Sequence, residues 1–241
     1  MPKTHLVCHR GANQIAPENT YAAAEGAIAY GAGFIEVDVR ASKDGVLYIL
    51  HDETVDRTTD GSGAIADMTS ADLDALDAGS WFAPDFAGQK LPKLDEYLAW
   101  LKGKCGIYIE IKQAPVEAVR DLVRKHGFAE NSYYFSFDED ISQELIEVAP
   151  DFPVMALNRL APDIATIARH GYRIIEFLPD EMTPENLVSA REHGMTIQVF
   201  HPDDDGEIFR SMLEAKIDYA NIDHPETFNR VREEWQAGLP A

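Results

Sequence analysis

The amino-acid sequence predicts an α/β protein, namely a (β/α)8 TIM barrel with a small insertion after its second strand. Two observations lead to this prediction. Short apolar runs alternate with helical stretches along nearly the whole chain, an order typical of a parallel sheet with crossover helices. In addition, one strand pair is joined by a link too short for parallel strands, which leaves eight strand–helix units.

The predicted elements are short and evenly spread. Nine apolar runs are strand candidates, at residues 5–8, 34–39, 46–50, 106–111, 133–137, 153–157, 173–177, 196–200 and 219–222. Eight helical candidates lie between them, at residues 20–30, 94–102, 116–126, 141–148, 163–170, 184–193, 207–216 and 225–235. Four helices begin near a proline, whose missing N–H costs nothing in the first turn: Pro115, Pro162, Pro184 and Pro225.

The ninth strand is explained by a hairpin around Asp44-Gly45. Asp-Gly between apolar runs is a strong hairpin signal, so residues 46–50 return antiparallel to residues 34–39. If Asp44 and Gly45 form a two-residue turn, Lys43 faces Val46 and His51 faces Asp38. A longer turn would shift this pairing.

Residues 53–91 do not fit the repeat. They are rich in Asp, Gly, Ser and Thr, with a short helix candidate at 70–76 and the aromatic pair Trp81-Phe82. A loop of this length without its own structure is uncommon. We expect a small inserted subdomain over one side of the barrel mouth, within a single domain that spans residues 1–241.

Composition and charge exclude several classes of protein. The 241 residues are 45% hydrophobic and 26% charged, with a net charge of -21. This charge argues against nucleic acid or an anionic membrane surface as partner, because both need a basic face. The start of the chain does not read as a signal peptide, and no apolar run approaches the roughly 20 residues of a membrane span. Cys8 and Cys105 have no metal or redox spacing. A cytoplasmic enzyme or binding protein is the expectation.

Two strands carry carboxylates on the face opposite their aliphatic residues. Glu36 and Asp38 share one face of residues 34–39, and Glu110 and Lys112 share the inward face of residues 107–112. Taken alone, the first strand also fits an exposed antiparallel strand. Three converging carboxylates repel one another unless a cation lies between them, and hard oxygen ligands suit Mg²⁺ or Ca²⁺.

The position of each histidine along its barrel strand separates structural from functional candidates. Three histidines each precede a glycine at a predicted helix end, which indicates helix capping: His126, His170 and His193. His5 opens the first strand, at the end of the barrel away from the active site. Four histidines follow the carboxyl ends of strands, where barrel active sites lie: His9, His51, His201 and His224.

These groups together indicate phosphate-transfer chemistry. Two imidazoles beside a divalent metal can act as base and acid, and Arg10 and Lys112 can hold the phosphate. His9-Arg10-Gly11 ends the first strand, so its imidazole and guanidinium enter the mouth together.

The chain resembles the glycerophosphodiester phosphodiesterase family over nearly its whole length. The resemblance lies in these motifs: His9-Arg10-Gly11, Pro17-Glu18-Asn19-Thr20, Glu36-Val37-Asp38, Lys43-Asp44-Gly45, His51-Asp52, Asp56-Arg57-Thr58-Thr59-Asp60-Gly61-Ser62-Gly63, Leu76-Asp77-Ala78-Gly79-Ser80-Trp81-Phe82 and Glu110-Ile111-Lys112. It implies a (β/α)8 barrel that hydrolyses glycerophosphodiesters to glycerol 3-phosphate and an alcohol. It also implies metal ligands at Glu36, Asp38 and Glu110, an acid–base pair at His9 and His51, and phosphate contacts from Arg10 and Lys112.

The second half departs from the family pattern after the seventh strand. The family usually has a tryptophan there, where this chain has Phe200 followed by His201, and His224 follows the usual aspartate of the last strand. We expect Phe200 to replace the aromatic pocket wall and Trp81 to help select the alcohol. The alcohol, the choice of Mg²⁺ or Ca²⁺, the oligomeric state and the roles of His201 and His224 stay open. Two alternatives also stay open: a lyase-like attack that gives a cyclic phosphate, and a barrel that binds polyol phosphates without turnover.

Overall fold

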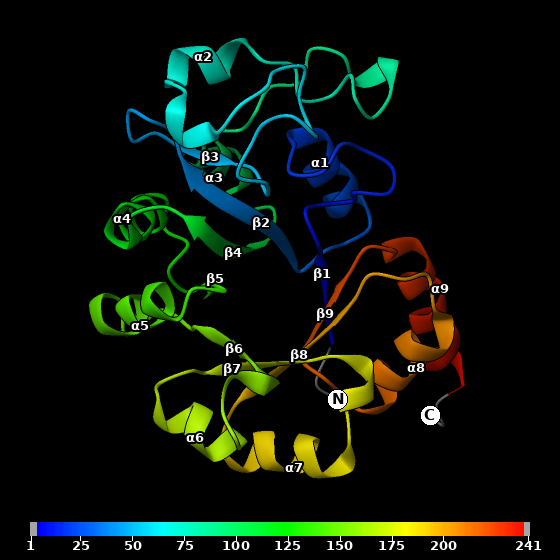
Figure 1. Cartoon of the computed structure of the whole chain (residues 1–241). Helices are drawn as coiled ribbons and strands as arrows, with labels where there is room; N and C mark the ends of the chain where they lie inside the picture. The colour runs from blue at the N-terminus through cyan, green and yellow to red at the C-terminus, as the bar shows by residue number, and fades with distance from the viewer. Residues whose placement is uncertain (1–3, 239–241) are drawn as a thin grey trace.

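The protein is a nearly closed barrel of parallel strands surrounded by helices (Figure 1). The computed structural model describes residues 4–238. Eight strands follow one another in the order β5-β4-β2-β1-β9-β8-β7-β6, and β3 pairs with β2 outside this path. The sequence prediction of a (β/α)8 barrel is therefore confirmed.

The strands are short and lie close to their predicted positions. Their bounds are β1 His5–Cys8, β2 Phe34–Ala41, β3 Leu47–Ile49, β4 Gly106–Gln113, β5 Ser132–Phe135, β6 Met155–Leu157, β7 Ile174–Phe177, β8 Thr196–His201 and β9 Tyr219–Ile222. Neighbours in the barrel pair in parallel, and Asp38 of β2 stands beside Glu110 of β4. The two carboxylate-bearing strands are therefore adjacent and in register.

The helices are six to thirteen residues long, and most of them connect one barrel strand to the next. Their bounds are α1 Tyr21–Ala29, α2 Ser70–Ala75, α3 Leu94–Leu101, α4 Val116–His126, α5 Glu139–Val148, α6 Ile164–Arg169, α7 Pro184–Glu192, α8 Gly206–Glu214 and α9 Pro225–Ala237. Single 3₁₀ turns are η1 Ile65–Asp67, η2 Pro84–Phe86, η3 Asn158–Leu160 and η4 Pro179–Glu181. None of the helices within residues 4–238 has the length and apolar character needed to cross a membrane.

The barrel core has two layers on either side of the strands. The larger one fills the space between the sheet and its helices, and isoleucines 107, 109 and 111 of β4 belong to it. The inner layer contains a stack of aromatic rings, in which Tyr133 lies 4.4 Å from Tyr108 and 4.9 Å from Tyr219 between ring centroids. This stack closes the lower part of the barrel, so the polar residues above it face the mouth.

The predicted register of the β2–β3 hairpin is wrong by one residue. Val39 pairs with Ile49, and the Leu50 N–H donates to the carbonyl of Asp38 at 2.9 Å, so Leu50 rather than His51 stands opposite Asp38. The turn is longer than two residues, because the Ser42 N–H donates to the Val46 carbonyl across three intervening residues. Gly45 takes the left-handed conformation that such a three-residue turn requires, at φ +82°.

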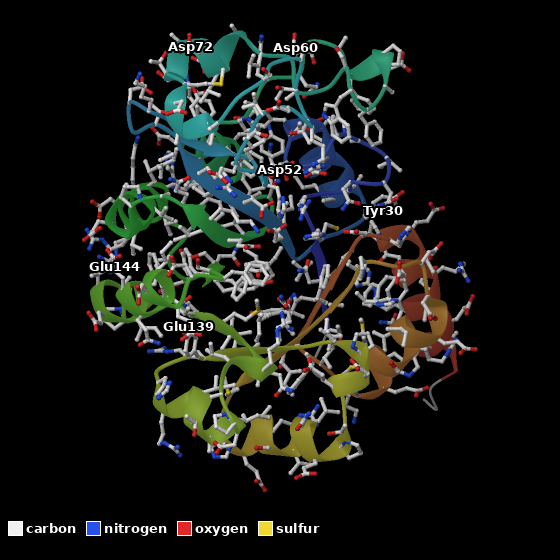
Figure 2. All side chains as sticks on the ribbon, viewed as in Figure 1. Tyr30, Asp52, Asp60, Asp72, Glu139 and Glu144 are labelled. Atoms are coloured by element: carbon white, nitrogen blue, oxygen red, sulfur yellow. The ribbon has the colours of Figure 1, made fainter. Side chains whose placement is uncertain are left out.

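The segment between β3 and α3 has its own small core. Tyr48, Val55, Ile65, Leu73 and Leu91 are among the buried residues of this apolar cluster. In Figure 1 the segment runs from cyan to green above α1 and β3, and in Figure 2 Asp52 lies at its junction with the barrel while Asp60 and Asp72 lie on its outer side. The segment is therefore folded and stands at one side of the barrel mouth.

Candidate active site

A cavity of about 210 Å³ opens at the carboxyl ends of the strands. Seven of the residues singled out in the sequence line it: His9, Arg10, Glu36, His51, Glu110, Lys112 and Phe200. They come from the turn after β1, from β2, β4 and β8, and from the segment after β3. The barrel thus brings together residues that are almost two hundred positions apart in the chain.

Three carboxylates form the acidic base of this site. Oxygens of Glu36, Asp38 and Glu110 lie within 4.8 Å of one another, and all three side chains are buried. One oxygen of Glu36, Oε1, has no hydrogen-bond donor. Hard oxygen ligands at this spacing fit Mg²⁺ or Ca²⁺. The residues present therefore fit a divalent cation, which would also complete the coordination of the unpartnered oxygen.

The charges of the three carboxyls are unequal. Burial, together with the neighbouring charges of Asp38 and Glu110, holds the pKa of Glu36 well above its ordinary value. Burial also tends to raise the pKa of Asp38, but Arg10 and Lys112 outweigh it and lower that pKa. Burial and the charge of Asp38 also raise the pKa of Glu110, although Lys112 opposes the rise. Two of the three acids therefore favour protonation beside one that stays ionised, as expected for carboxyls that share a buried site.

Arg10 reaches the carboxylates through an unusual turn. Its φ of +57° lies in the left-handed region, which places its backbone N–H 2.8 Å from Glu36 Oε2. Its guanidinium donates to Glu18 at 3.1 Å, and Nε lies 3.4 Å from Asp38 Oδ2. A methyl group on the following residue, Gly11, would come within 2.7 Å of the Ala23 backbone, so the turn requires glycine there.

His9 is held in one orientation by a carboxylate from the far end of the chain. Its Nδ1 lies 2.8 Å from Asp223 Oδ1, and the same oxygen accepts from Asn13 Nδ2 at 2.7 Å. A carboxylate only accepts hydrogen bonds, so Nδ1 carries the proton and Nε2 is available to a substrate. The ring packs edge-on against Phe200 at a centroid distance of 5.0 Å.

His51 has the same arrangement in the same cavity. Its Nδ1 lies 2.7 Å from Asp52 Oδ1, which again leaves Nε2 available. Arg57 donates to both oxygens of Asp52 and to both oxygens of Glu18 at 2.7–3.0 Å. Burial lowers the pKa of His51, against the raising effect of Asp38 and Asp52. His51 reaches the cavity although the register that suggested it was wrong.

Lys112 joins the acidic base to the rim. Its Nζ lies 2.5 Å from Glu110 Oε1 and 3.3 Å from Asp38 Oδ1. The same ammonium stands 5.3 Å from the ring centroid of Phe137. Lys112 and Arg10 are therefore the two cations of the cavity wall.

Several lining residues were missed from the sequence. Tyr108, Phe135, Phe137, Glu176 and Asn221 also line the cavity, and Asn221 Oδ1 is buried without a hydrogen-bond donor. Tyr108 shares one face of β4 with Glu110 and Lys112, but nothing local marks the others as functional. The aspartates that orient the histidines, Asp52 and Asp223, were not predicted as site residues. For Asp52 the neighbouring position was a usable signal, whereas Asp223 is 214 residues from His9.

Four residues singled out in the sequence do not line this cavity, and one of them, Asp38, belongs to the adjoining carboxylate cluster. Trp81 donates its indole N–H to the Ala78 carbonyl at 3.0 Å and packs against Phe82 on the protein surface. His201 packs edge-on against Phe209, and its Nε2 is buried without a hydrogen-bond partner. His224 lines a separate cavity beside Asp223. The influence of Trp81 on the alcohol stays a prediction.

Comparisons with known proteins agree with this geometry. The chain is 32% identical, over 95% of its length and 98% of the relative's, to a glycerophosphodiester phosphodiesterase from Caldanaerobacter subterraneus subsp. tengcongensis. The crystal structure of a glycerophosphodiester phosphodiesterase from Agrobacterium tumefaciens covers 95% of this chain at 43% identity and a TM-score of 0.92, and all of that chain is matched.

A more distant structure shares the fold. An Oleispira antarctica phosphodiesterase, solved in complex with the product sn-glycerol-3-phosphate, has a TM-score of 0.86 at 22% identity and covers 95% of this chain and 96% of its own. The model of the glycerophosphoryl diester phosphodiesterase family matches residues 9–227, which include every residue of the cavity. The chain belongs to the glycerophosphoryl diester phosphodiesterase family.

Proposed function

We propose that this protein hydrolyses glycerophosphodiesters to glycerol 3-phosphate and an alcohol, with a divalent metal and two histidines. The observation that carries the proposal is the pairing of His9 with Asp223 and of His51 with Asp52. Both pairs leave Nε2 available in one cavity whose base is a carboxylate cluster. Two oriented imidazoles can serve one reaction as base and acid.

The two histidines have complementary tasks in this proposal. One Nε2 removes the proton of the attacking water, and the other donates a proton to the departing alkoxide. Following the family resemblance, we assign the base to His9 and the acid to His51. Asp223 and Asp52 act as positioning residues, because each fixes the tautomer of its histidine.

Positive charge must be supplied locally, since the net charge is -21. Glu36, Asp38 and Glu110 would hold a Mg²⁺ or Ca²⁺ ion, which when bound supplies charge neutralisation and polarises a phosphoryl oxygen. Arg10 and Lys112 would contact the phosphate. In the structure they pair with the carboxylates, so they are already oriented at the cavity wall.

Two other functions use the same residues. Attack by a substrate hydroxyl would give a cyclic phosphate before any water reacts, and time-resolved ³¹P NMR separates this product from glycerol 3-phosphate. A barrel that only binds polyol phosphates has no use for two oriented imidazoles, and both are present. The hydrolase is therefore the better supported function.

The test is a panel of glycerophosphodiesters assayed with Mg²⁺, with Ca²⁺ and with chelator. We expect release of glycerol 3-phosphate with at least one metal and none in chelator, since the carboxylates repel one another without a cation. A protein that hydrolyses no diester, or one that keeps its full rate after exhaustive metal removal, would contradict the proposal.

A further inference from the structure

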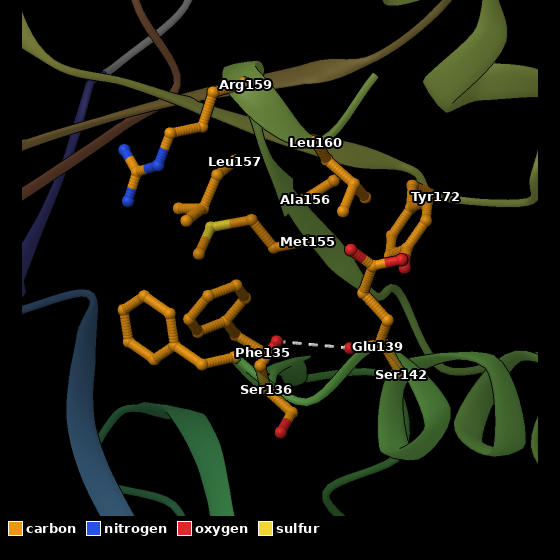
Figure 3. A pocket seen from close by; sticks show the side chains of 11 residues that line it. Phe135, Ser136, Glu139, Ser142, Met155, Ala156, Leu157, Arg159, Leu160 and Tyr172 are labelled. Atoms are coloured by element: carbon orange, nitrogen blue, oxygen red, sulfur yellow. Dashed lines mark hydrogen bonds between the residues drawn. The ribbon is translucent and has the colours of Figure 1, made fainter.

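A second cavity of about 290 Å³ lies beside the catalytic one. Figure 3 shows its side chains: Met155, Leu157, Leu160 and Tyr172 surround the same space as Phe135, with Arg159 at one end and Glu139 at the other. For scale, an engineered apolar cavity of about 150 Å³ binds benzene. This pocket, which we call the seam pocket, is therefore large enough for a ligand group.

The seam pocket exists because the barrel is incompletely closed at one place. β5 and β6 share only one bridge, between Tyr134 and Val154, whereas other neighbouring strands pair over longer stretches. Beyond that bridge the two strands separate, and residues from inside and outside the barrel meet in the gap. Met155 belongs to the inner layer of the core, while Tyr172 belongs to the outer one.

The seam pocket adjoins the catalytic cavity. Phe135 and Phe137 line both. Phe137 is 66% exposed although it is a large apolar side chain, and the Lys112 ammonium lies 5.3 Å from its ring centroid. Lys112 lines the catalytic cavity and Phe137 lines both cavities, so the lysine that we propose holds the phosphate lies at the border of the seam pocket.

The lining decides which chemistry fits. Most of it is aromatic or aliphatic, and the two charged members, Arg159 and Glu139, carry opposite signs. The opposite charges of Arg159 and Glu139 give an ionic group no net electrostatic attraction in the pocket. An apolar group is stabilised there because its surface is removed from water. A small polar alcohol would leave this apolar wall in contact with water.

We propose that the seam pocket binds the leaving alcohol and selects alcohols that carry an apolar alkyl or aryl portion. The inference rests on the proposed phosphodiester hydrolysis, because it assigns one ester group of that substrate to this pocket. Each methylene that enters the pocket strengthens binding about fourfold. The gain is the same in the ground state and the transition state, so it lowers KM and leaves kcat unchanged.

The test is a series of glycerophosphoalkyl esters with ethyl, butyl, hexyl and octyl groups, assayed beside glycerophosphocholine. We expect KM to fall at least about tenfold from ethyl to hexyl, and the fall to stop once the pocket is full. Calorimetric titration of the same esters into His9→Ala protein gives the affinity without turnover.

Variants at Leu157 connect the effect to the pocket. Leu157 is half-buried at the end of β6, so Leu157→Trp should fill the pocket and reduce the hexyl-to-ethyl KM ratio to about one. Leu157→Ala should enlarge the pocket, so that KM goes on falling to longer alkyl chains before it levels off. This variant keeps the test valid if the tryptophan variant does not fold. Leu178→Trp is the control, because Leu178 follows the next strand, β7, is 39% exposed and lines neither cavity.

Each outcome decides the inference. A KM that does not change with chain length, while glycerophosphocholine is hydrolysed, rejects the seam pocket and leaves the hydrolase intact. An unchanged chain-length dependence in both Leu157 variants rejects it as well. If no ester is hydrolysed, the hydrolase fails, and calorimetric affinities that do not depend on chain length would then reject the pocket separately.

Discussion

At the scale of single residues, the site consists of two matched pairs. His9 donates from Nδ1 to Asp223, and His51 donates from Nδ1 to Asp52, so the two imidazoles present the same nitrogen to the cavity. Their surroundings differ. His9 packs against Phe200, whereas His51 is linked through Asp52 to the exposed Arg57. The two histidines are thus equivalent in orientation but not in environment.

The leaving group can separate their roles. An alkoxide needs a proton as it departs, so His51→Ala should cost about 10²–10⁴-fold with glycerophosphocholine. A nitrophenolate leaves without protonation, so the same variant should lose much less activity with a nitrophenyl phosphodiester. His9→Ala should lose comparable activity on both substrates, because water must be activated in each case. Steady-state kcat/KM on both substrates measures this.

The opposite pattern would exchange the two roles. Equal losses on both substrates in both variants would mean that neither histidine donates the proton. Asp52→Asn and Asp223→Asn are the matched variants of the positioning residues. Each should lose kcat/KM on the same substrates as the alanine variant of its own histidine, but by a smaller factor.

A fourth acid of the cavity, Glu176, stands apart from the acidic cluster. Its Oε2 accepts from Gln198 Nε2 at 2.7 Å, and Gln198 Oε1 accepts from the Tyr133 hydroxyl at 2.6 Å. Burial raises the pKa of Glu176 to about 7, with a further contribution from Glu110, while Gln198 and Arg159 oppose the rise. The ordinary value is 4.5, so the folded protein holds this proton more tightly than the unfolded chain does.

This difference makes stability depend on pH in a defined direction. The stabilising proton is fully bound in both states below pH 4.5, and its contribution is lost as pH rises toward 7. Glu176→Gln removes the ionisation, so the variant should be more stable than the parent by about 3 kcal/mol at pH 8 and by less than about 1 kcal/mol at pH 5. Urea unfolding in chelator at both pH values is the measurement. A stability difference that is independent of pH would show that Glu176 does not titrate in this range.

At the scale of elements, the turn after β1 is the most constrained part of the mouth. It combines Arg10 at φ +57° with Gly11 at φ +82°, and it lies directly against α1 at Ala23. We expect Gly11→Ala to destabilise the fold by roughly 2 kcal/mol or more, through the strained φ and the close contact. It should also impair catalysis, because Arg10 carries the N–H that binds Glu36.

Gly45 provides the matched control for this variant. It has the same φ of +82°, but no atom lies within 4 Å of a Cβ added there. Gly45→Ala should therefore show the cost of the left-handed conformation alone. Thermal melts of both variants give the comparison, and equal losses of stability would contradict a role for the contact with α1.

The segment of residues 53–91 is connected to the site by Arg57. We propose that these residues form an inserted subdomain that supports the mouth, because Arg57 joins Asp52 to Glu18 and Glu18 also binds Arg10. Arg57→Met should lower kcat about tenfold with little change in KM, since it releases the positioning residue of His51 rather than a substrate contact. A rise in KM that exceeds the fall in kcat would argue against this positioning role of Arg57.

Trp81→Ala tests the same segment at a residue that lacks such a connection. The sequence-based prediction is an altered order of rates among choline, ethanolamine and glycerol esters, with unchanged metal affinity. An unaltered order in a folded variant would reject a role for Trp81 in selecting the alcohol.

At the scale of the whole molecule, charge and metal binding are linked. The chain has a net charge of -21, and three of its carboxylates converge in the barrel. A cation that binds only the folded state raises its stability by mass action, by about 2.7 kcal/mol at one hundred times the Kd. The melting temperature should therefore rise with saturating Mg²⁺ or Ca²⁺, and Glu36→Gln should reduce that rise. An identical rise in the variant would mean that Glu36 is not a ligand.

Much of the fold could be predicted because it is encoded locally. β1, β9 and α4 have the bounds that the sequence predicted, since their alternating or helical periodicity needs no knowledge of distant residues. The same alternation placed Glu36, Asp38, Glu110 and Lys112 on inward faces, and the barrel rule placed His9 and His51 at the mouth. For these residues, position within an element is enough to define the site.

Other features depended on contacts that no local pattern contains. The length of the turn at Asp44-Gly45 decided the β2–β3 register. The cavity wall also contains Glu176 and Asn221, which belong to strands far along the chain. The sequence by itself determined the alternation of elements, the carboxylate faces and the family, because each depends on short spacings. Only the tertiary structure decided which carboxylate orients each histidine and where the barrel stays open, because those depend on how distant strands meet.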